Sequence, residues 1–223
     1  MPDTPNLAPL VTGLAFVLAV VFGAVGNRVS FCTMGAISDI VNFGHWQRMR
    51  MWVLAIAVAI AGAGALQATG LVDLTKSIYT GPRLSWLSML VGGFLFGFGM
   101  TLASGCGSKT LIRIGGGNVK SLVVLMFLGV SAYMTLRGVF GLWRANGLDP
   151  VRFDFAALGA ATSDLPGLAA AAGLAGARQW LPFVVAAALL VWTFASREFR
   201  SSREMILGGI VIGAVIVGGW YVS

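Results

Sequence analysis

Two cysteines, Cys32 and Cys106, are the residues of this chain whose type and setting best fit a chemical role. Each lies in a glycine-containing polar break within apolar sequence, with a Phe-Gly pair ten residues before it and a serine two residues before it. A thiol is a soft, polarisable group that donates a weak hydrogen bond and contacts other sulfur atoms well. The matched spacing therefore indicates a gate or a binding point for a small ligand.

Three basic residues accompany these breaks: Arg28 precedes the first thiol, and Lys109 and Arg113 follow the second. Charged side chains at membrane depth are rare and usually functional. Together with the thiols, these cations predict a narrow path of positive potential with a soft sulfur at two points. Such a path suits a small anion that itself carries sulfur.

The breaks must also turn the backbone, and their glycines permit this. We expect a short helix to begin after each break, near Thr33 and near Ser108, with its N-terminal N–H groups directed into the break, where they favour an anion. In the second break, Ser104, Gly105 and Gly107 are candidate substrate-binding residues beside the thiol.

Simpler interpretations remain open. Cysteine is often buried as a small hydrophobic residue, and the two thiols could form a disulfide if both face an oxidising side. The three basic side chains could extend to the membrane surface, as we expect for Arg48, Arg50 and Lys120. Asp39 is expected to pair with one of these cations or to cap a half-helix.

The composition indicates that the helices that position these residues lie in a membrane. Of 223 residues, 57% are hydrophobic and 10% are charged, and the mean hydropathy is +0.87; soluble domains carry about 25% charged residues. The net charge of +7 comes from basic residues at the ends of apolar segments, so we expect no nucleic-acid binding. With one histidine and no Cys-x-x-Cys motif, the sequence predicts no metal site, no cofactor and no enzymatic activity.

Six apolar segments reach or approach the ~20 residues that a membrane-spanning helix needs. The first follows a stretch that contains Asp3 and no Lys or Arg, so we expect a retained helix rather than a signal peptide. The sequence therefore predicts an all-α integral membrane protein with about six spanning helices, in which short re-entrant helices carry the cysteines. The segments are Leu10–Val25, Met51–Thr69, Leu84–Ala103, Ser121–Leu136, Trp180–Ala195 and Met205–Val222.

The chain is expected to form a single membrane domain, residues 1–223, built on a repeat of 74 residues, the distance from Cys32 to Cys106. Repeat units at about 9–70 and 84–140 would each consist of a helix, a cysteine break and a second helix, with further helices at about 180–222. In the mixed segment Gly138–Gln179, the residues Ser163–Pro166 predict the start of a short helix.

The distribution of Lys and Arg predicts an N-terminus outside the membrane. The first, third and fifth loops carry nine of these residues and the second and fourth carry six. The cluster of Arg197, Arg200 and Arg203 lies in a short loop, where the positive-inside rule is strongest.

Two stretches resemble the YeeE/YedE family of sulphur-transport membrane proteins: Gly26–Ala36 (GNRVSFCTMGA) and Gly97–Gly107 (GFGMTLASGCG). The second contains the pattern G-x-G-x-x-L-A-x-G-C, which is similar to the family's hallmark loop. The resemblance implies an hourglass helical bundle in the bacterial inner membrane. It also implies that Cys32 and Cys106 are two thiols of a relay that passes thiosulfate by S–H···S contacts, without covalent chemistry.

The chain departs from this family in one respect. Full-length members carry a further glycine-cysteine loop in a second half, and this chain has no third cysteine. We therefore expect it to be an N-terminal portion of a longer chain or to work with a partner subunit; a small soluble sulfur-carrier protein is another candidate partner. Because related proteins are linked to other sulfur or selenium species, the resemblance does not fix the substrate.

The function predicted from the sequence is membrane uptake of a small inorganic sulfur anion, with thiosulfate favoured. A membrane thiol–disulfide oxidoreductase is one alternative, although the lack of a Cys-x-x-Cys pair argues against it. A non-transporting subunit of a larger sulfur-transport complex is the other.

Overall fold

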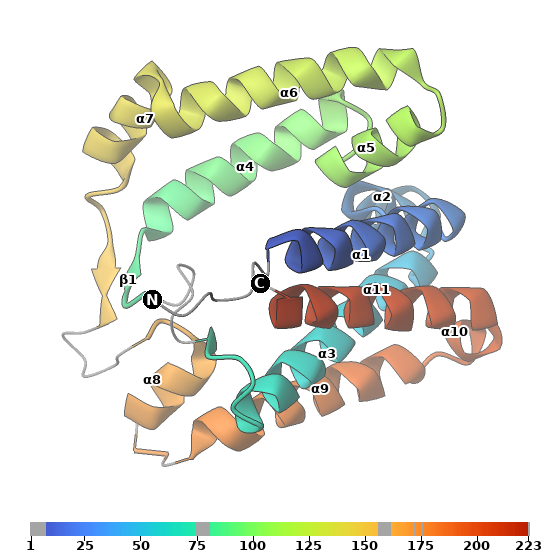
Figure 1. Cartoon of the computed structure of the whole chain (residues 1–223), viewed down its shortest axis with the longest axis vertical. Helices are drawn as coiled ribbons and strands as arrows, with labels where there is room; N and C mark the ends of the chain where they lie inside the picture. The colour runs from blue at the N-terminus through green and yellow to red at the C-terminus, as the bar shows by residue number, and fades with distance from the viewer. Residues whose placement is uncertain (1–7, 75–80, 156–161, 172, 175, 223) are drawn as a thin grey trace. The chain divides into compact units, whose positions relative to one another are not determined.

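The structure, a computed structural model, describes residues 8–74, 81–155, 162–171, 173–174 and 176–222 (Figure 1). The expectation of no signal peptide rests partly on residues 1–7, which lie outside the described residues. In chain order the elements are α1 (Ala8–Arg28), α2 (Thr33–Phe43), α3 (Gln47–Ala68), β1 (Arg83–Leu84), α4 (Trp86–Leu102), α5 (Gly107–Gly115), α6 (Val119–Arg137), α7 (Val139–Trp143), the π-helical turn η2 (Arg144–Leu148), β2 (Phe153–Asp154), α8 (Leu165–Ala171), α9 (Ala177–Phe194), α10 (Arg197–Ser201) and α11 (Arg203–Val222).

The described part of the chain contains six helical segments that are long and apolar enough to cross a membrane. They coincide with the six predicted segments, and α2 and α5 continue two of them beyond the cysteine breaks. The helices α1 and α6, 21 and 19 residues long, extend past the apolar runs into flanking glycine-rich and polar sequence. These helices confirm the prediction of an all-α integral membrane protein. Helices suit a lipid environment because they satisfy the hydrogen bonds of the backbone within each segment.

The chain divides into two compact units, and the first comprises the described residues of 1–31, 36–73 and 182–223. In this unit α11 packs against both α3 and α1. The core is formed by Met51 and Leu54 of α3 with Phe199 of α10, all three fully buried.

Glycines on α11 allow its close approach to α3. A Cβ atom added at Gly213 would lie 2.8 Å from the carbonyl oxygen of Ala55, and one added at Gly209 would lie 2.9 Å from that of Met51. Both distances are shorter than a Cβ atom tolerates, so only glycine fits. This close packing through small residues is the usual way for membrane helices to associate.

Two arginines of α3 have more specific roles than extension to the membrane surface. Arg50 donates hydrogen bonds to the carbonyl oxygens of Trp192 and Thr193, and its guanidinium lies 4.6 Å from the centre of the Trp192 ring. It therefore caps the C-terminal end of α9, where carbonyl groups lack helical partners. Arg48 lies 3.3 Å from a carboxylate oxygen of Asp39, which confirms that Asp39 pairs with one of these cations.

The second unit comprises residues 32–35 and the described residues of 74–181. In it, α6 packs against α5 and α7, and the short strands β1 and β2 pair antiparallel, with Arg83 opposite Asp154 and Leu84 opposite Phe153. The sequence pattern predicts neither this pairing nor the turn η2. Strands of two residues are too short to show the alternating pattern by which strands are predicted.

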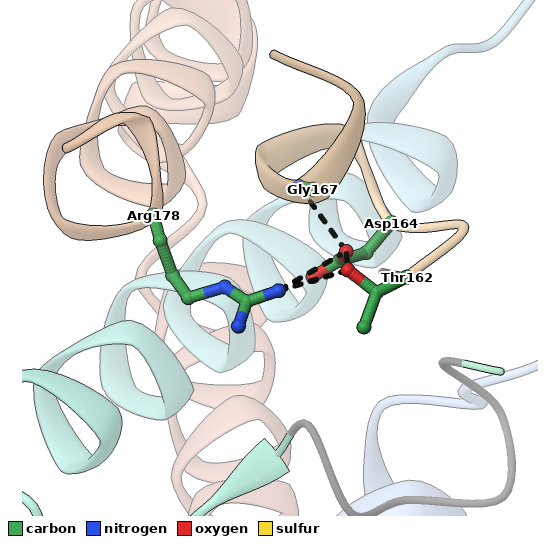
Figure 2. A network of polar contacts seen from close by, with 4 residues as sticks. All are labelled: Thr162, Asp164, Gly167 and Arg178. Atoms are coloured by element: carbon green, nitrogen blue, oxygen red, sulfur yellow. Dashed lines mark hydrogen bonds and ion pairs between the residues drawn. The ribbon is translucent and has the colours of Figure 1, made fainter. Parts of the chain in front are cut away.

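A polar cluster fixes the start of α8 (Figure 2). Asp164 accepts a hydrogen bond from the backbone N–H of Gly167 at 3.2 Å and another from the Thr162 hydroxyl. Arg178, in the first turn of α9, donates to that hydroxyl at 2.8 Å and lies 3.6 Å from the Asp164 carboxylate. The start predicted at Ser163–Pro166 is confirmed, with Asp164 as the capping residue.

Candidate functional site

The two cysteine breaks fold into the same turn. Ser30, after α1, and Ser104, after α4, both adopt the left-handed conformation, with φ of 49° and 54°. In both turns the serine N–H bonds to the carbonyl three residues earlier (3.2 and 3.3 Å), and the next N–H bonds to the carbonyl five residues earlier (2.9 and 3.1 Å). This is the Schellman ending of a helix, which usually has glycine at the left-handed position. The likeness predicted for the breaks thus extends to their backbone hydrogen bonds; the larger repeat units remain a prediction.

Each turn delivers a cysteine to the start of a short helix. Cys32 directly precedes α2, and its Sγ accepts a hydrogen bond from the backbone N–H of Gly35 at 3.5 Å. Cys106 has an extended backbone and is the N-cap of α5, where its carbonyl oxygen accepts both the N–H and the hydroxyl of Thr110 at 3.0 and 3.2 Å. The helix starts predicted from the sequence are confirmed to within one residue.

The structure brings the two thiols into contact. The Sγ atoms of Cys32 and Cys106 lie 3.8 Å apart, both cysteines are free, and both belong to the second compact unit. At this separation the S–H of one donates a weak hydrogen bond to the sulfur of the other. Cys32 is 1% exposed and Cys106 is half-buried, so Cys106 is the more accessible of the two thiols. The described residues contain no group of three or more His, Cys, Asp or Glu side chains that could hold a metal ion.

Lys109 is the cation most closely tied to this pair. Its aliphatic stem packs over Gly105. A Cβ atom added at Gly105 would lie 3.3 Å from Cδ of Lys109. Arg113 lies one helical turn further along α5, on the same face, and is exposed. Neither side chain takes part in an ion pair within the described part of the chain, so both positive charges remain available to an anion.

Arg28 has a different setting. It is the last residue of α1, in the first compact unit, and its Nε lies 2.8 Å from a carboxylate oxygen of Glu204 on α11. Glu204 is not among the residues predicted from the sequence, although an acidic residue in the first turn of the last helix is a detectable signal. Because the Arg28 charge is already paired, its role at the thiol site remains a prediction.

The three other candidate residues shape the second turn. Ser104 provides its left-handed corner, and Gly105 is buried beneath the Lys109 stem. Gly107 begins α5, where an added Cβ atom would make an ordinary contact at 3.9 Å with Leu128. An added methyl group would therefore be more crowded at position 105 than at position 107.

The described residues thus define an all-α, multi-pass membrane protein in which two apolar helices end in matching turns, each of which presents a thiol. Comparison with known proteins then gives the family. The chain belongs to the Sulphur transport family, whose sequence profile matches residues 28–223, a range that contains both cysteines.

Curated relatives agree with this family. The chain is similar to the thiosulfate transporter TsuA of Spirochaeta thermophila, at 28% identity over 197 residues that cover 86% of this chain and 56% of the relative. It is also similar to the thiosulfate transporter TsuA of Escherichia coli, at 30% identity over 127 residues that cover 57% of this chain and 33% of the relative. A third relative, the probable transporter YedE of Escherichia coli, is 30% identical over 109 residues, 48% of this chain and 25% of the relative. The chain thus spans about half the length of the first relative and less of the others.

Proposed function

We propose that this chain takes part in the uptake of a small sulfur-containing anion across a membrane, with thiosulfate as the favoured substrate. The observation that carries the proposal is the contact of Cys32 and Cys106 at 3.8 Å, at the starts of two short helices. Two soft thiols in one place suit a ligand whose reactive end is also sulfur.

The surroundings of the pair suit a doubly charged anion. The N-terminal N–H groups of α2 and α5 carry partial positive charge, which favours anions at these helix ends. Lys109 adds a full charge without an ion-pair partner among the described residues. In the proposed site the oxygen atoms of thiosulfate face these groups, and its terminal sulfur accepts S–H contacts from the two thiols in turn.

The relatives support the substrate class. Two proteins to which the chain is similar are named thiosulfate transporters. Because the chain spans about half of the first and a third of the second, the activity of a whole transporter is part of the proposal. So are the hourglass bundle, a partner in the form of a second half or a separate subunit, and a soluble sulfur carrier that receives the product.

We further propose that the protein lies in a bacterial-type inner membrane with its N-terminus outside. Support comes from the cluster Arg197, Arg200 and Arg203 around the short helix α10, which would then face the cytoplasm. In this proposal the site binds its substrate by non-covalent contacts, and the protein catalyses no reaction.

The thiol role is tested by uptake of radiolabelled thiosulfate in cells that lack other thiosulfate transporters. We expect Cys32→Ala and Cys106→Ala to reduce uptake by about tenfold or more, the effect of losing ~1.4 kcal/mol of favourable contact. Cys106→Ser should fail as well, because a hydroxyl has nearly the size of the thiol but not its softness. Thr135→Ala, which removes an exposed hydroxyl from α6 of the same unit, is the matched control and should transport normally.

Competition by unlabelled anions identifies the feature that the site selects. Sulfate has the charge of thiosulfate but no terminal sulfur, so an excess of thiosulfate should block uptake while an excess of sulfate should not. Parental uptake by both cysteine variants at equal expression would overturn the thiol role. The chain reconstituted alone in liposomes can be compared with the chain plus a partner subunit. Thiosulfate uptake only when the partner is present would show that the chain is one subunit of the transporter.

A further inference from the structure

We propose that Cys32 and Cys106 form a reversible disulfide that closes the thiol site under oxidising conditions. Both cysteines are free and their sulfur atoms lie 3.8 Å apart within one compact unit. A disulfide needs about 2.05 Å between its sulfur atoms, so the two must approach by about 1.8 Å. The formation of this bond does not depend on the proposed function; only its effect on uptake does.

The backbone holds the two sulfur atoms ready for this bond. Each cysteine follows a turn whose two N–H groups are bonded to carbonyls at 2.9–3.3 Å, and each directly precedes a helix. The fold has therefore already brought together residues that are 74 positions apart in the chain. Linking them in the folded protein requires no further ordering of the intervening chain, so only the two side chains must move.

The burial of the two thiols sets the order of the reaction with a hydroperoxide. The half-buried Cys106 reacts first: its sulfur attacks a peroxide oxygen, the O–O bond breaks, and the departing hydroxide takes the thiol proton as water. The sulfur of Cys32 then attacks the resulting sulfenic acid, the S–S bond forms, and the S–O bond breaks. The hydroxyl leaves with the Cys32 proton as a second water, so two thiols are oxidised and one hydrogen peroxide is reduced to two waters.

The disulfide removes the groups that the proposed site uses. Neither sulfur retains an S–H to donate, and the two sulfur atoms are bonded to each other rather than available to a ligand. A dithiol such as dithiothreitol reverses the bond by thiol–disulfide exchange and restores both S–H groups. The pair therefore makes uptake dependent on the redox state of the surroundings.

The bond is tested on the purified full chain treated with hydrogen peroxide and then denatured. Alkylation with a polyethylene glycol maleimide should count two thiols before treatment, none after it, and two again after dithiothreitol. The treated chain should run as a monomer on a non-reducing gel, and mass spectrometry should find the peptides of Cys32 and Cys106 linked. Two thiols that persist after treatment, or loss of thiols without this link, would overturn the proposal.

Single variants test the order of the reaction. In Cys32→Ser the sulfenic acid at Cys106 has no resolving thiol and should accumulate, so that dimedone traps it. In Cys106→Ser the buried Cys32 should give little adduct at the same dose of peroxide. Equal trapping in the two variants would contradict the assigned order.

Thiosulfate uptake by vesicles distinguishes the disulfide proposal from the proposed transport function. Thiosulfate uptake in reducing buffer tests the proposed function alone, and the cross-link can be measured on a chain that does not transport. If the disulfide forms and uptake in the same vesicles stays unchanged, the closure of the site is refuted.

Discussion

Two serines in the left-handed conformation are the most unusual residues of the site. At Ser30 and Ser104 the φ angles of 49° and 54° cost an L-amino acid about 1–2 kcal/mol. Glycine occupies this position in most helix endings of the same type because it avoids that cost. Both breaks nevertheless have serine two residues before the thiol, which is consistent with a use for the hydroxyl at the site.

Replacing these serines separates stability from function. We expect Ser30→Gly and Ser104→Gly each to raise the free energy of unfolding by about 0.5–1 kcal/mol, because glycine removes the left-handed cost but gains freedom in the unfolded chain. Thermal unfolding in detergent measures this, and uptake by Ser104→Gly should fall despite the higher stability. Ser131→Gly, within α6, is the control and should be destabilising by roughly 0.5 kcal/mol. A less stable Ser104→Gly protein would contradict the assigned strain.

At the scale of elements, the pair α3–α11 is the best-defined helix packing of the first unit. In it, glycines of α11 face backbone carbonyls of α3, and side chains such as Leu54 and Val58 pack beside them. Side chains can rotate away from an added methyl group, whereas a helix carbonyl cannot move without moving the helix. This packing is therefore sensitive to single substitutions at its glycines.

The sensitivity is testable with two alanines on one helix. Gly213→Ala should lower the free energy of unfolding by about 1–3 kcal/mol, because the new Cβ atom would lie 2.8 Å from the Ala55 carbonyl. Gly219→Ala, also in α11, meets nothing within 4 Å and should be neutral or slightly stabilising. Unfolding temperatures of the two variants, measured side by side, check this. Equal temperatures would show that α3 and α11 do not pack as described.

At the scale of the whole molecule, the sequence predicted what the membrane dictates and missed what depends on distant contacts. The spanning helices follow from hydropathy, and the starts of α2 and α5 follow from the polar breaks before them. The sequence left open whether Cys32 and Cys106 meet, because a spacing of 74 residues does not fix a distance in space. The cap that Arg50 forms on α9 and the pairing of β1 with β2 were missed for the same reason.

Reporter fusions test the orientation predicted for the whole chain. With the N-terminus outside, a fusion of alkaline phosphatase after Gly70 should be active, and one after Ser201 should be inactive. The positive-inside rule gives this result, because the second position lies among Arg197, Arg200 and Arg203. Green fluorescent protein at the same two positions should give the opposite pattern. Activity reversed at both positions would place the N-terminus in the cytoplasm.

The stem of Lys109 lies over Gly105, the residue immediately before Cys106. The ammonium group and the sulfur are therefore anchored to one short piece of backbone and must shift together whenever that piece shifts. An anion that draws the ammonium towards itself would pull the sulfur along with it. In the proposed site, electrostatic attraction and sulfur recognition would thus be mechanically coupled rather than act as two independent steps.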